Sequence, residues 1–191
     1  MAPATMEHRQ SLTSIMSSTG ARHLPQAKRK VQRQLLHRPP NPGDVEAVTC
    51  HLVRTFTIIG SPGYPTPPEE MHARIRQSVL RGYHPAGVVR QLVAIIANGD
   101  RSPQLRRITC PTLVIHGRAD PLVPIACGVD TAVKIPNSRL VAIDGFGHDF
   151  PPQLFERLAS LIADHATRAT ASQVAASAGR LPAQGKAASS S

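Results

Sequence analysis

Several features that would assign this sequence to a common class are missing from it. It contains no Trp, and aromatic residues make up only 3% of its 191 residues. No apolar run approaches the roughly 18 residues of a membrane-spanning helix, and the first residues, MAPATMEHRQ, lack the apolar stretch of a secretory signal peptide. The three cysteines have neither metal-binding nor C-x-x-C spacing. We therefore expect no membrane span, no secretion, and reduced thiols in the cytoplasm.

A motif on which many hydrolases depend is also missing. In G-x-S-x-G, a sharp strand-to-helix turn presents a nucleophilic serine, and the sequence contains no such pattern. The nearest imitation, AASAG at Ala175–Gly179, lies in a stretch rich in Ala and Ser with no strand before it, so we reject it. The sequence therefore offers no serine nucleophile of this type.

The net charge is strongly positive, at +10 from 22 basic and 12 acidic residues. Such an excess raises the question of nucleic-acid binding, and the densest basic stretch is Lys28–Arg33. Aromatic residues are not interleaved with these charges, and no zinc-finger, helix-turn-helix or RNA-binding signature is present. We interpret the basic residues as a solvated surface, and a nucleic-acid binder using Lys28–Arg33 stays as the last-ranked alternative.

Composition and the spacing of apolar residues divide the chain into four parts. Residues 1–24 form an N-terminal segment with one core strand, residues 25–100 are helical, residues 101–166 alternate strands with helices, and residues 167–191 form a tail. The tail is rich in Ala, Ser, Gly and Gln without an apolar period, so we expect it to be disordered.

The helical part is recognised by its apolar spacing and its breaks. Helices are expected at Val45–Ile59 and Pro85–Ala97. A helix between them is expected to begin at Pro67, with Thr66 and Glu69 forming a capping box.

Three strands and two helices are expected outside that part. Ser11–Ser17 and Arg139–Ile143 have the composition of short strands, and the continuous apolar run Thr112–His116 is typical of a strand that is covered on both faces. A helix at about Pro124–Lys134 separates the last two strands, which makes them a parallel crossover unit. A final helix from Pro151 carries an apolar stripe of Leu154, Phe155, Leu158, Leu161 and Ile162.

An Asp and a His follow the two strands of this crossover unit. Asp120 comes four residues after Thr112–His116, and His148 comes five residues after Arg139–Ile143. The carboxyl ends of parallel strands lie at one edge of a sheet, where α/β proteins place their ligands. A carboxylate beside an imidazole fixes the tautomer of the histidine and stabilises its charged form when the histidine removes a proton from a nucleophile. The spacing therefore predicts the acid and base of a catalytic triad.

Other titratable residues nearby are weaker candidates. Asp144 stands only four residues before His148 and Asp149 follows it directly, so we interpret both as loop residues. His116 lies within a strand, where we expect it to pack or to hydrogen-bond.

Glycines give the two loops at this edge their freedom to turn. Gly117 allows the chain to leave its strand sharply, and Gly145 and Gly147 let the histidine loop curl over the sheet edge.

The segments PTLVIHGRADPLVP and IPNSRLVAIDGFGHDFP resemble the last strands of α/β-hydrolase-fold enzymes, in which the acid follows one strand and the histidine the next. The resemblance covers about Ser11–His165. In it, Ser11–Ser18 corresponds to the strand after the nucleophile helix, and residues 25–99 to the helical cap over the active site. The stretches GSPGYPTPPEE and RGYHPAGVVRQLVAIIANGDR are similar to bacterial esterases, lipases and anthracycline methylesterases.

The resemblance implies the C-terminal strands of an α/β-hydrolase fold, flanking helices and a helical cap. It implies hydrolysis of a small carboxylic ester through a Ser-His-Asp triad, with Asp120 as the acid, His148 as the base, and no cofactor or metal. Because the nucleophile half is missing, we expect an N-terminally truncated hydrolase that is inactive alone. The unpaired apolar sheet edge leaves an alternative, a non-catalytic protein that pairs with another chain through this edge.

Overall fold

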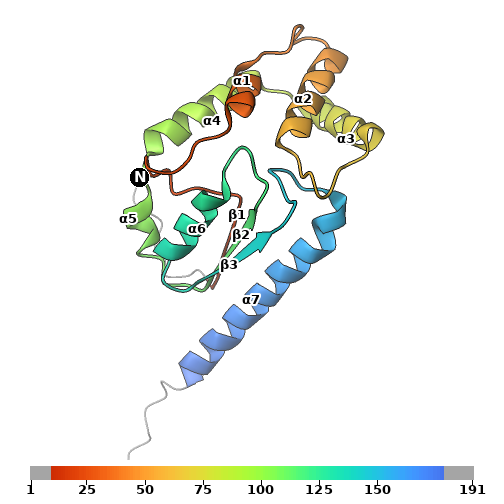
Figure 1. Cartoon of the computed structure of the whole chain (residues 1–191). Coiled ribbons are helices and arrows are strands. Elements are labelled where there is room, and N and C mark those ends of the chain that lie inside the picture. The colour runs from red at the N-terminus through yellow and green to blue at the C-terminus, as the bar shows by residue number, and fades with distance from the viewer. Residues whose placement is uncertain (1–9, 179–191) are drawn as a thin grey trace, which may run out of the picture.

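The computed structural model describes residues 10–178, with side chains as far as Ser172 (Figure 1). Its centre is a sheet of three parallel strands, β1 (Leu12–Ile15), β2 (Thr112–Gly117) and β3 (Ser138–Ile143), in that spatial order. The predicted strands and their parallel crossover are confirmed. Within the described residues no helix is both long and apolar enough to cross a membrane.

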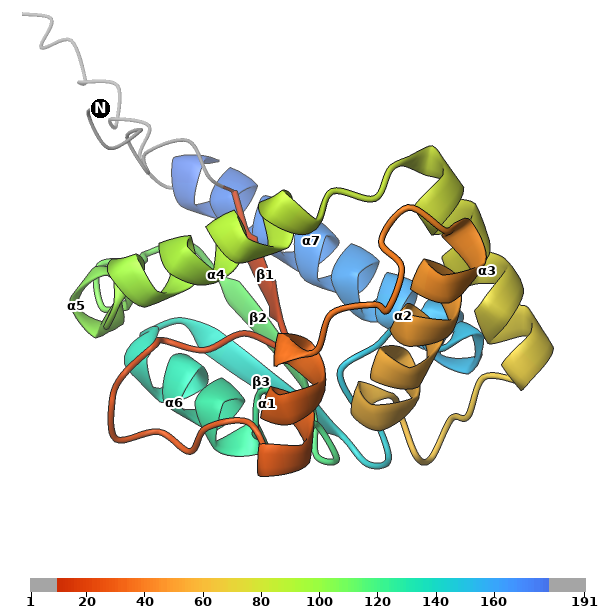
Figure 2. The same cartoon turned by 90° about the horizontal axis from the view of Figure 1, so that it is seen from above.

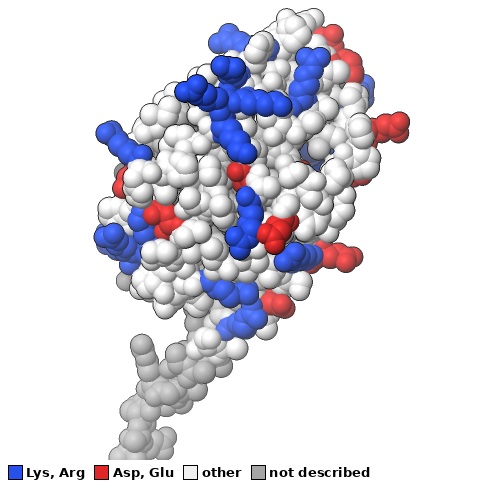
Figure 3. All heavy atoms as spheres, viewed as in Figure 1, with Lys and Arg blue, Asp and Glu red and all other residues white. Residues whose placement is uncertain are grey.

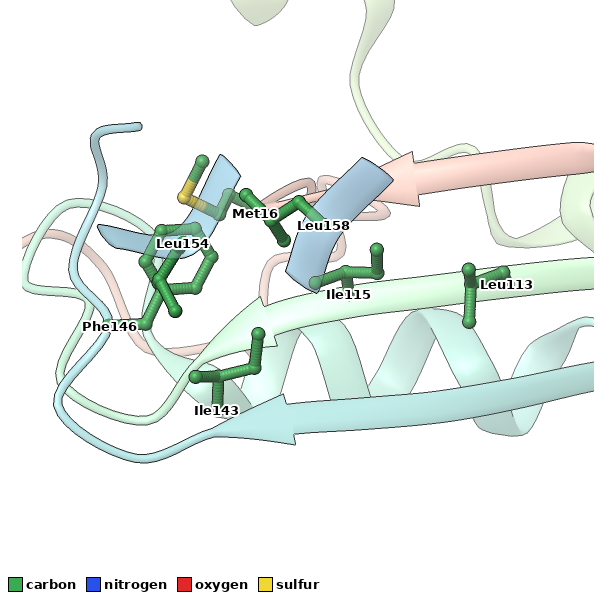
Figure 4. Close-up of a cluster of buried hydrophobic side chains, with 7 residues drawn as sticks. All are labelled: Met16, Leu113, Ile115, Ile143, Phe146, Leu154 and Leu158. Carbon is green, nitrogen blue, oxygen red and sulfur yellow. The ribbon is translucent and has the colours of Figure 1, made fainter. Parts of the chain in front are cut away.

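Helices cover both faces of the sheet. Helix α6 (Ile125–Lys134) lies on one face, and α7 (Phe155–Ala178), preceded by the short helix η2 (Pro152–Leu154), lies on the other (Figures 1 and 2). Every residue of β2 is buried, as its uninterrupted apolar run predicted. The main core lies between the sheet and the helices η2 and α7 (Figure 4). Its side chains come from β2, β3, η2, α7 and the segments that follow β1 and β3: Met16, Leu113, Ile115, Ile143, Phe146, Leu154 and Leu158.

Residues 25–99 contain four helices and no strand: α1 (Arg29–Leu36), α2 (Val45–Ile59), α3 (Pro68–Arg81) and α4 (Pro85–Asn98). A fifth, very short helix, α5 (Ser102–Leu105), leads towards β2. Helix α2 has the predicted bounds and is capped by Asp44, whose Oδ1 accepts hydrogen bonds from the main-chain N–H groups of Glu46 and Ala47. Helices α2 and α3 pack on each other through Val48, Ile75 and Val79.

The capping box predicted at Thr66 is wrong. Helix α3 begins at Pro68, Pro67 precedes it, and no side chain caps it. Pro67 thus stands in the capping position, and Thr66 lies one residue too early to cap the helix. Its hydroxyl is buried without a hydrogen-bond partner.

Helix α4 has apolar residues but no buried ones. Its exposed apolar side chains are Val88, Val89, Leu92, Val93, Ile95 and Ile96. The helix ends beside the loop that follows β1, where Arg101 donates its main-chain N–H to the carbonyl of Thr19. Contiguous exposed apolar patches often mark interaction sites of proteins.

The tail expected to be disordered from residue 167 is wrong for its first part, because α7 continues to Ala178. His165 and Ala169 are buried, and Nε2 of His165 lies 3.1 Å from the carbonyl oxygen of Leu12. Helix α7 therefore runs along the sheet beyond the apolar stripe. Phe155 and Ile162, predicted in that stripe, are 48% and 37% exposed. Residues 179–191 lie outside the described residues.

Candidate active site

The structure brings Asp120 and His148 together at the carboxyl edge of the sheet. Asp120 follows the end of β2, and His148 follows the end of β3. Nδ1 of His148 lies 2.7 Å from Oδ2 of Asp120. Parallel strand direction produces this meeting across 28 residues of sequence, as the spacing predicted.

The carboxylate of Asp120 is fully buried and has a partner on each oxygen. Its Oδ1 accepts hydrogen bonds from the main-chain N–H groups of Leu122 at 2.9 Å and Val123 at 2.8 Å. Oδ2 is left to face His148. Because a buried carboxylate needs donors, these contacts fix both the position and the orientation of the group.

The hydrogen-bond network assigns the tautomer of His148. An ionised carboxylate can only accept hydrogen bonds, so Nδ1 of His148 carries the proton and donates a hydrogen bond to Asp120. Nε2 is then free to accept a proton, and the side chain is 24% exposed. Among the described residues, no serine or threonine hydroxyl is hydrogen-bonded to this imidazole. The pair can therefore act as a base, through Nε2 of His148, towards a hydroxyl that is not among its present hydrogen-bond partners.

The loop that carries His148 is fastened to the end of α2. The main-chain N–H of His148 donates to the carbonyl of Ile59 at 2.7 Å, and that of Gly147 donates to Oγ of Ser61 at 2.9 Å. A Cβ on Gly147 would lie 2.1 Å from the carbonyl oxygen of Gly60. Only glycine permits this approach. The sequence predicted that this glycine lets the loop curl, but it did not predict the contact with the end of α2.

Asp149 is a loop residue, as predicted, but it is also part of this fastening. Ser61 donates its hydroxyl to Oδ1 of Asp149, and the carboxyl is 7% exposed. Burial raises the pKa of Asp149 above its ordinary value, against the opposing effect of the Ser61 hydrogen bond. Sequence reasoning missed Ser61, because nothing local connects it with a residue 88 positions later.

The other candidates lie where the sequence placed them. Asp144 is exposed and pairs with Arg118 at 3.0 Å. His116 is fully buried and its Nε2 lies 2.8 Å from the carbonyl oxygen of Val123, while its Nδ1 has no hydrogen-bond partner. Nε2 of His116 is also 3.8 Å from Oδ2 of Asp120, so the two buried side chains are neighbours.

Two cavities flank the loop of Asp120. The larger, of about 870 Å³, is lined by residues that include Arg22, Ile95, Arg101, Leu122 and Cys127. The smaller, of about 430 Å³, lies between this loop and the end of α2 and is lined by residues that include Phe56, Ser61, Ala119 and Asp149. Both are large enough for a small organic ligand.

Basic side chains do not form one continuous strip on the face seen in Figure 3. Several gather over the end that carries α1, others are scattered, and acidic side chains lie between the scattered ones. Val31, in the middle of Lys28–Arg33, is buried against the rest of the molecule. The interpretation of these charges as a solvated surface stays a prediction.

Comparison with known proteins relates the chain to ester hydrolases. No protein-family model matches it. It is 39% identical over 70 residues to the rhodomycin D methylesterase of Streptomyces sp. strain C5, a match that covers 37% of this chain and 24% of that protein. It is 33% identical over 86 residues to the pimeloyl-[acyl-carrier protein] methyl ester esterase of Nitrosomonas europaea, covering 42% of this chain and 34% of that protein.

Solved structures share the arrangement of strands and helices. A meta-cleavage product hydrolase from Pseudomonas fluorescens matches with a TM-score of 0.60 at 16% identity, over 82% of this chain and 55% of that one. An esterase from a Rhodococcus species matches with a TM-score of 0.56 at 19% identity, over 83% and 56%. Likeness at this identity shows the fold alone. The chain spans about half the length of these structures, and its sequence matches cover a quarter to a third of the curated relatives.

Proposed function

Because this chain has a partial α/β-hydrolase fold and is a relative of the esterases that share it, we propose that it supplies the acid and base of a serine esterase site. The observation that carries the proposal is the 2.7 Å contact between His148 Nδ1 and Asp120 Oδ2 at the carboxyl edge of the sheet. His148 would accept a proton at Nε2 from a hydroxyl nucleophile, and Asp120 would stabilise the imidazolium that results.

We propose that the nucleophile and the donors for the oxyanion come from another polypeptide. The 191 residues contain no G-x-S-x-G, and His148 has no hydroxyl partner among the described residues. We propose that the polypeptide carrying this nucleophile docks along β1. Within the described sheet β1 pairs only with β2, so its other edge is open.

The surface beside β1 suits such docking. A cavity of about 440 Å³ runs along the strand, lined by residues of β1, α5 and α6 and of the segments that follow these two helices, including Leu12, Ile15, Leu105, Ile108 and Ile135. The exposed apolar face of α4 ends next to the loop that follows β1. Covering both surfaces with one partner would remove apolar area from water and satisfy the free backbone groups of β1.

For the substrate we propose a methyl ester of a larger acyl group. Both curated relatives described above are named for methyl-ester hydrolysis. The cavity of about 870 Å³ lies against Leu122 and Val123, directly after Asp120, and takes apolar lining from Ile95 and Ile96 of α4. We propose that these apolar helix residues line the pocket for the acyl group.

A chimera tests the proposed catalytic roles. The N-terminal part of the Streptomyces methylesterase, through its nucleophile helix, is joined ahead of Gln10, and turnover of an activated aryl ester is measured. The chimera is expected to hydrolyse the ester. His148→Ala should abolish turnover, and Asp120→Asn should lower kcat by roughly 10⁴-fold. Asp144→Asn is the matched control and should change little, because this carboxylate is exposed. Turnover that survives in His148→Ala would refute the proposal.

A labelling experiment on the chain as it stands covers the case in which the chimera does not fold. The purified chain is treated with a fluorophosphonate, which modifies activated serines, and is examined by mass spectrometry. We expect no adduct. An adduct on one of its own serines that is lost in His148→Ala would show that the nucleophile lies within this chain.

The open edge also supports a second candidate, a non-catalytic protein that binds another chain. It predicts a stable complex through β1 and α4 whether or not His148 is intact. Val93→Asp on the exposed face of α4 should weaken the complex without lowering the stability of the chain, because this side chain is 60% exposed. A soluble monomer that recovers no partner from its native cells would argue against this function.

A further inference from the structure

Three side chains that bind metals well meet on the outer surface of the helix pair α2–α3. They are Glu46 and Cys50 of α2 and His72 of α3. One ligand atom from each lies within 4.8 Å of the others. This cluster is separate from the dyad, and nothing in the proposed esterase function uses it.

The helices hold the three residues in place. Glu46 and Cys50 are four residues apart on α2 and therefore share one face of the helix. His72 approaches this face from α3, and the two helices are packed together through a common core below it. Nε2 of His72 lies 2.6 Å from Oε1 of Glu46, and the thiol of Cys50 donates to the same oxygen at 3.5 Å.

We propose that Glu46, Cys50 and His72 bind a divalent zinc ion or a cation of similar softness, with water at the fourth position. Thiolate, imidazole and carboxylate are the three ligand types that zinc takes in proteins. A hard ion such as Mg²⁺ prefers oxygen ligands only, so the sulfur and nitrogen of this set select against it.

The spacing of the ligand atoms fits a tetrahedral site. Bonds of about 2.3 Å to sulfur and about 2.0 Å to oxygen and nitrogen place sulfur and oxygen about 3.5 Å apart, and oxygen and nitrogen about 3.3 Å apart. The first separation is already present at 3.5 Å. The second requires His72 and Glu46 to separate by roughly 0.7 Å from their 2.6 Å hydrogen bond. Both are side chains at the surface of the helix pair, so we expect their rotation to provide this separation.

Charges around the cluster act in both directions. The hydrogen bond from His72, followed by that from Cys50, lowers the pKa of Glu46. The hydrogen bond to Glu46 raises the pKa of the Cys50 thiol. Metal binding to a cysteine releases the proton of its sulfur in any site of this kind. Arg54 and Arg76 are close enough to weaken the attraction for a cation.

Metal binding here would tie α2 to α3. The far end of α2 carries Ile59, which accepts the main-chain hydrogen bond of His148. Because the ion binds the folded chain and cross-links two helices, it should raise the melting temperature of the protein.

Cobalt is the probe that reads the thiolate directly. The tag-free chain is titrated with Co²⁺ at neutral pH, and a thiolate-to-cobalt charge-transfer band with tetrahedral d–d absorption is expected. Excess Zn²⁺ should displace the cobalt and raise the melting temperature. Cys50→Ser should remove the charge-transfer band, and His72→Asn and Glu46→Gln should each weaken binding at least roughly tenfold.

Matched controls separate this site from other ligands of the chain. Cys110→Ser and His84→Asn change a thiol and an imidazole away from the cluster and should leave the titration unchanged. Circular dichroism checks that each variant is folded, which is expected because Glu46 and Cys50 are exposed. Absence of a charge-transfer band in the parent chain would overturn the proposal. Its survival in Cys50→Ser, or equal zinc affinity in all variants, would do the same.

Discussion

The main-chain N–H of His148 donates to the carbonyl of Ile59, the last residue of α2, across 2.7 Å. Carbonyls in the last turn of a helix have no partner within the helix. Here the histidine loop provides one, so a loop at the sheet edge and a helix of the preceding segment stabilise each other. The position of the imidazole therefore depends on α2 as well as on the sheet.

Gly147→Ala tests this dependence. The new Cβ would lie 2.1 Å from the carbonyl oxygen of Gly60 and 2.4 Å from its carbonyl carbon, and backbone atoms cannot rotate away. We expect a loss of about 1–3 kcal/mol in the free energy of unfolding, measured by urea denaturation. Gly43→Ala is the control, because its Cβ would meet only a side-chain oxygen at 3.7 Å. Equal stability of the two variants would show that the loop is not held against α2.

Asp120→Asn should reverse the tautomer of His148. Leu122 and Val123 donate to Oδ1, so the amide oxygen of the asparagine must stay on that side. Its NH₂ group then faces Nδ1 of His148 and donates to it, which moves the imidazole proton to Nε2. Nitrogen NMR of the labelled imidazole distinguishes the two tautomers in the purified chain. A proton that remains on Nδ1 in the variant would contradict the assignment.

Local patterns in the sequence predicted the sheet and the dyad because both depend on short-range signals. The apolar run of Thr112–His116 predicted a strand buried on both faces, which β2 confirms. Parallel direction then determined that residues following the strands share an edge. The catalytic roles of Asp120 and His148 stay predictions.

Long-range contacts account for what the sequence did not predict. Ser61 reaches Asp149 across 88 residues, and no periodicity connects them. The capping box at Thr66 fails for a local reason, because the helix begins one residue later than the pattern indicated and Pro67 takes the capping position. Helix α4 has the apolar residues of a buried helix but lies exposed. Its composition predicts a helix with an apolar face and does not predict which surface that face contacts.

Asp149→Asn should change how stability depends on pH. Burial raises the pKa of Asp149 in the folded chain above its ordinary value of 3.8. Its contribution to stability is therefore full below the unfolded pKa and is lost as the pH rises through the folded pKa. Asparagine has no charge to lose, and its side-chain oxygen can still accept from Ser61.

The measurement for Asp149 is the free energy of unfolding between about pH 3 and pH 7. The difference between Asp149→Asn and the parent chain should shift in favour of the variant as the pH rises. Asp144→Asn, which changes a carboxylate that is 90% exposed, is the control. A difference that is constant with pH would mean that burial does not disfavour the charge of Asp149.

Ala169→Glu tests whether α7 packs on the sheet beyond the apolar stripe. Ala169 is 2% exposed and lies one helical turn after His165, whose Nε2 is 3.1 Å from the carbonyl oxygen of Leu12. A glutamate there would bury a charge or push the helix away, and we expect a loss of roughly 2 kcal/mol or more in the free energy of unfolding. Ala166→Glu makes the same change on the exposed side of the same turn and should stay within about 0.5 kcal/mol of the parent. Equal effects in the two variants would mean that this part of the chain does not contact the sheet in solution, as its composition alone had suggested.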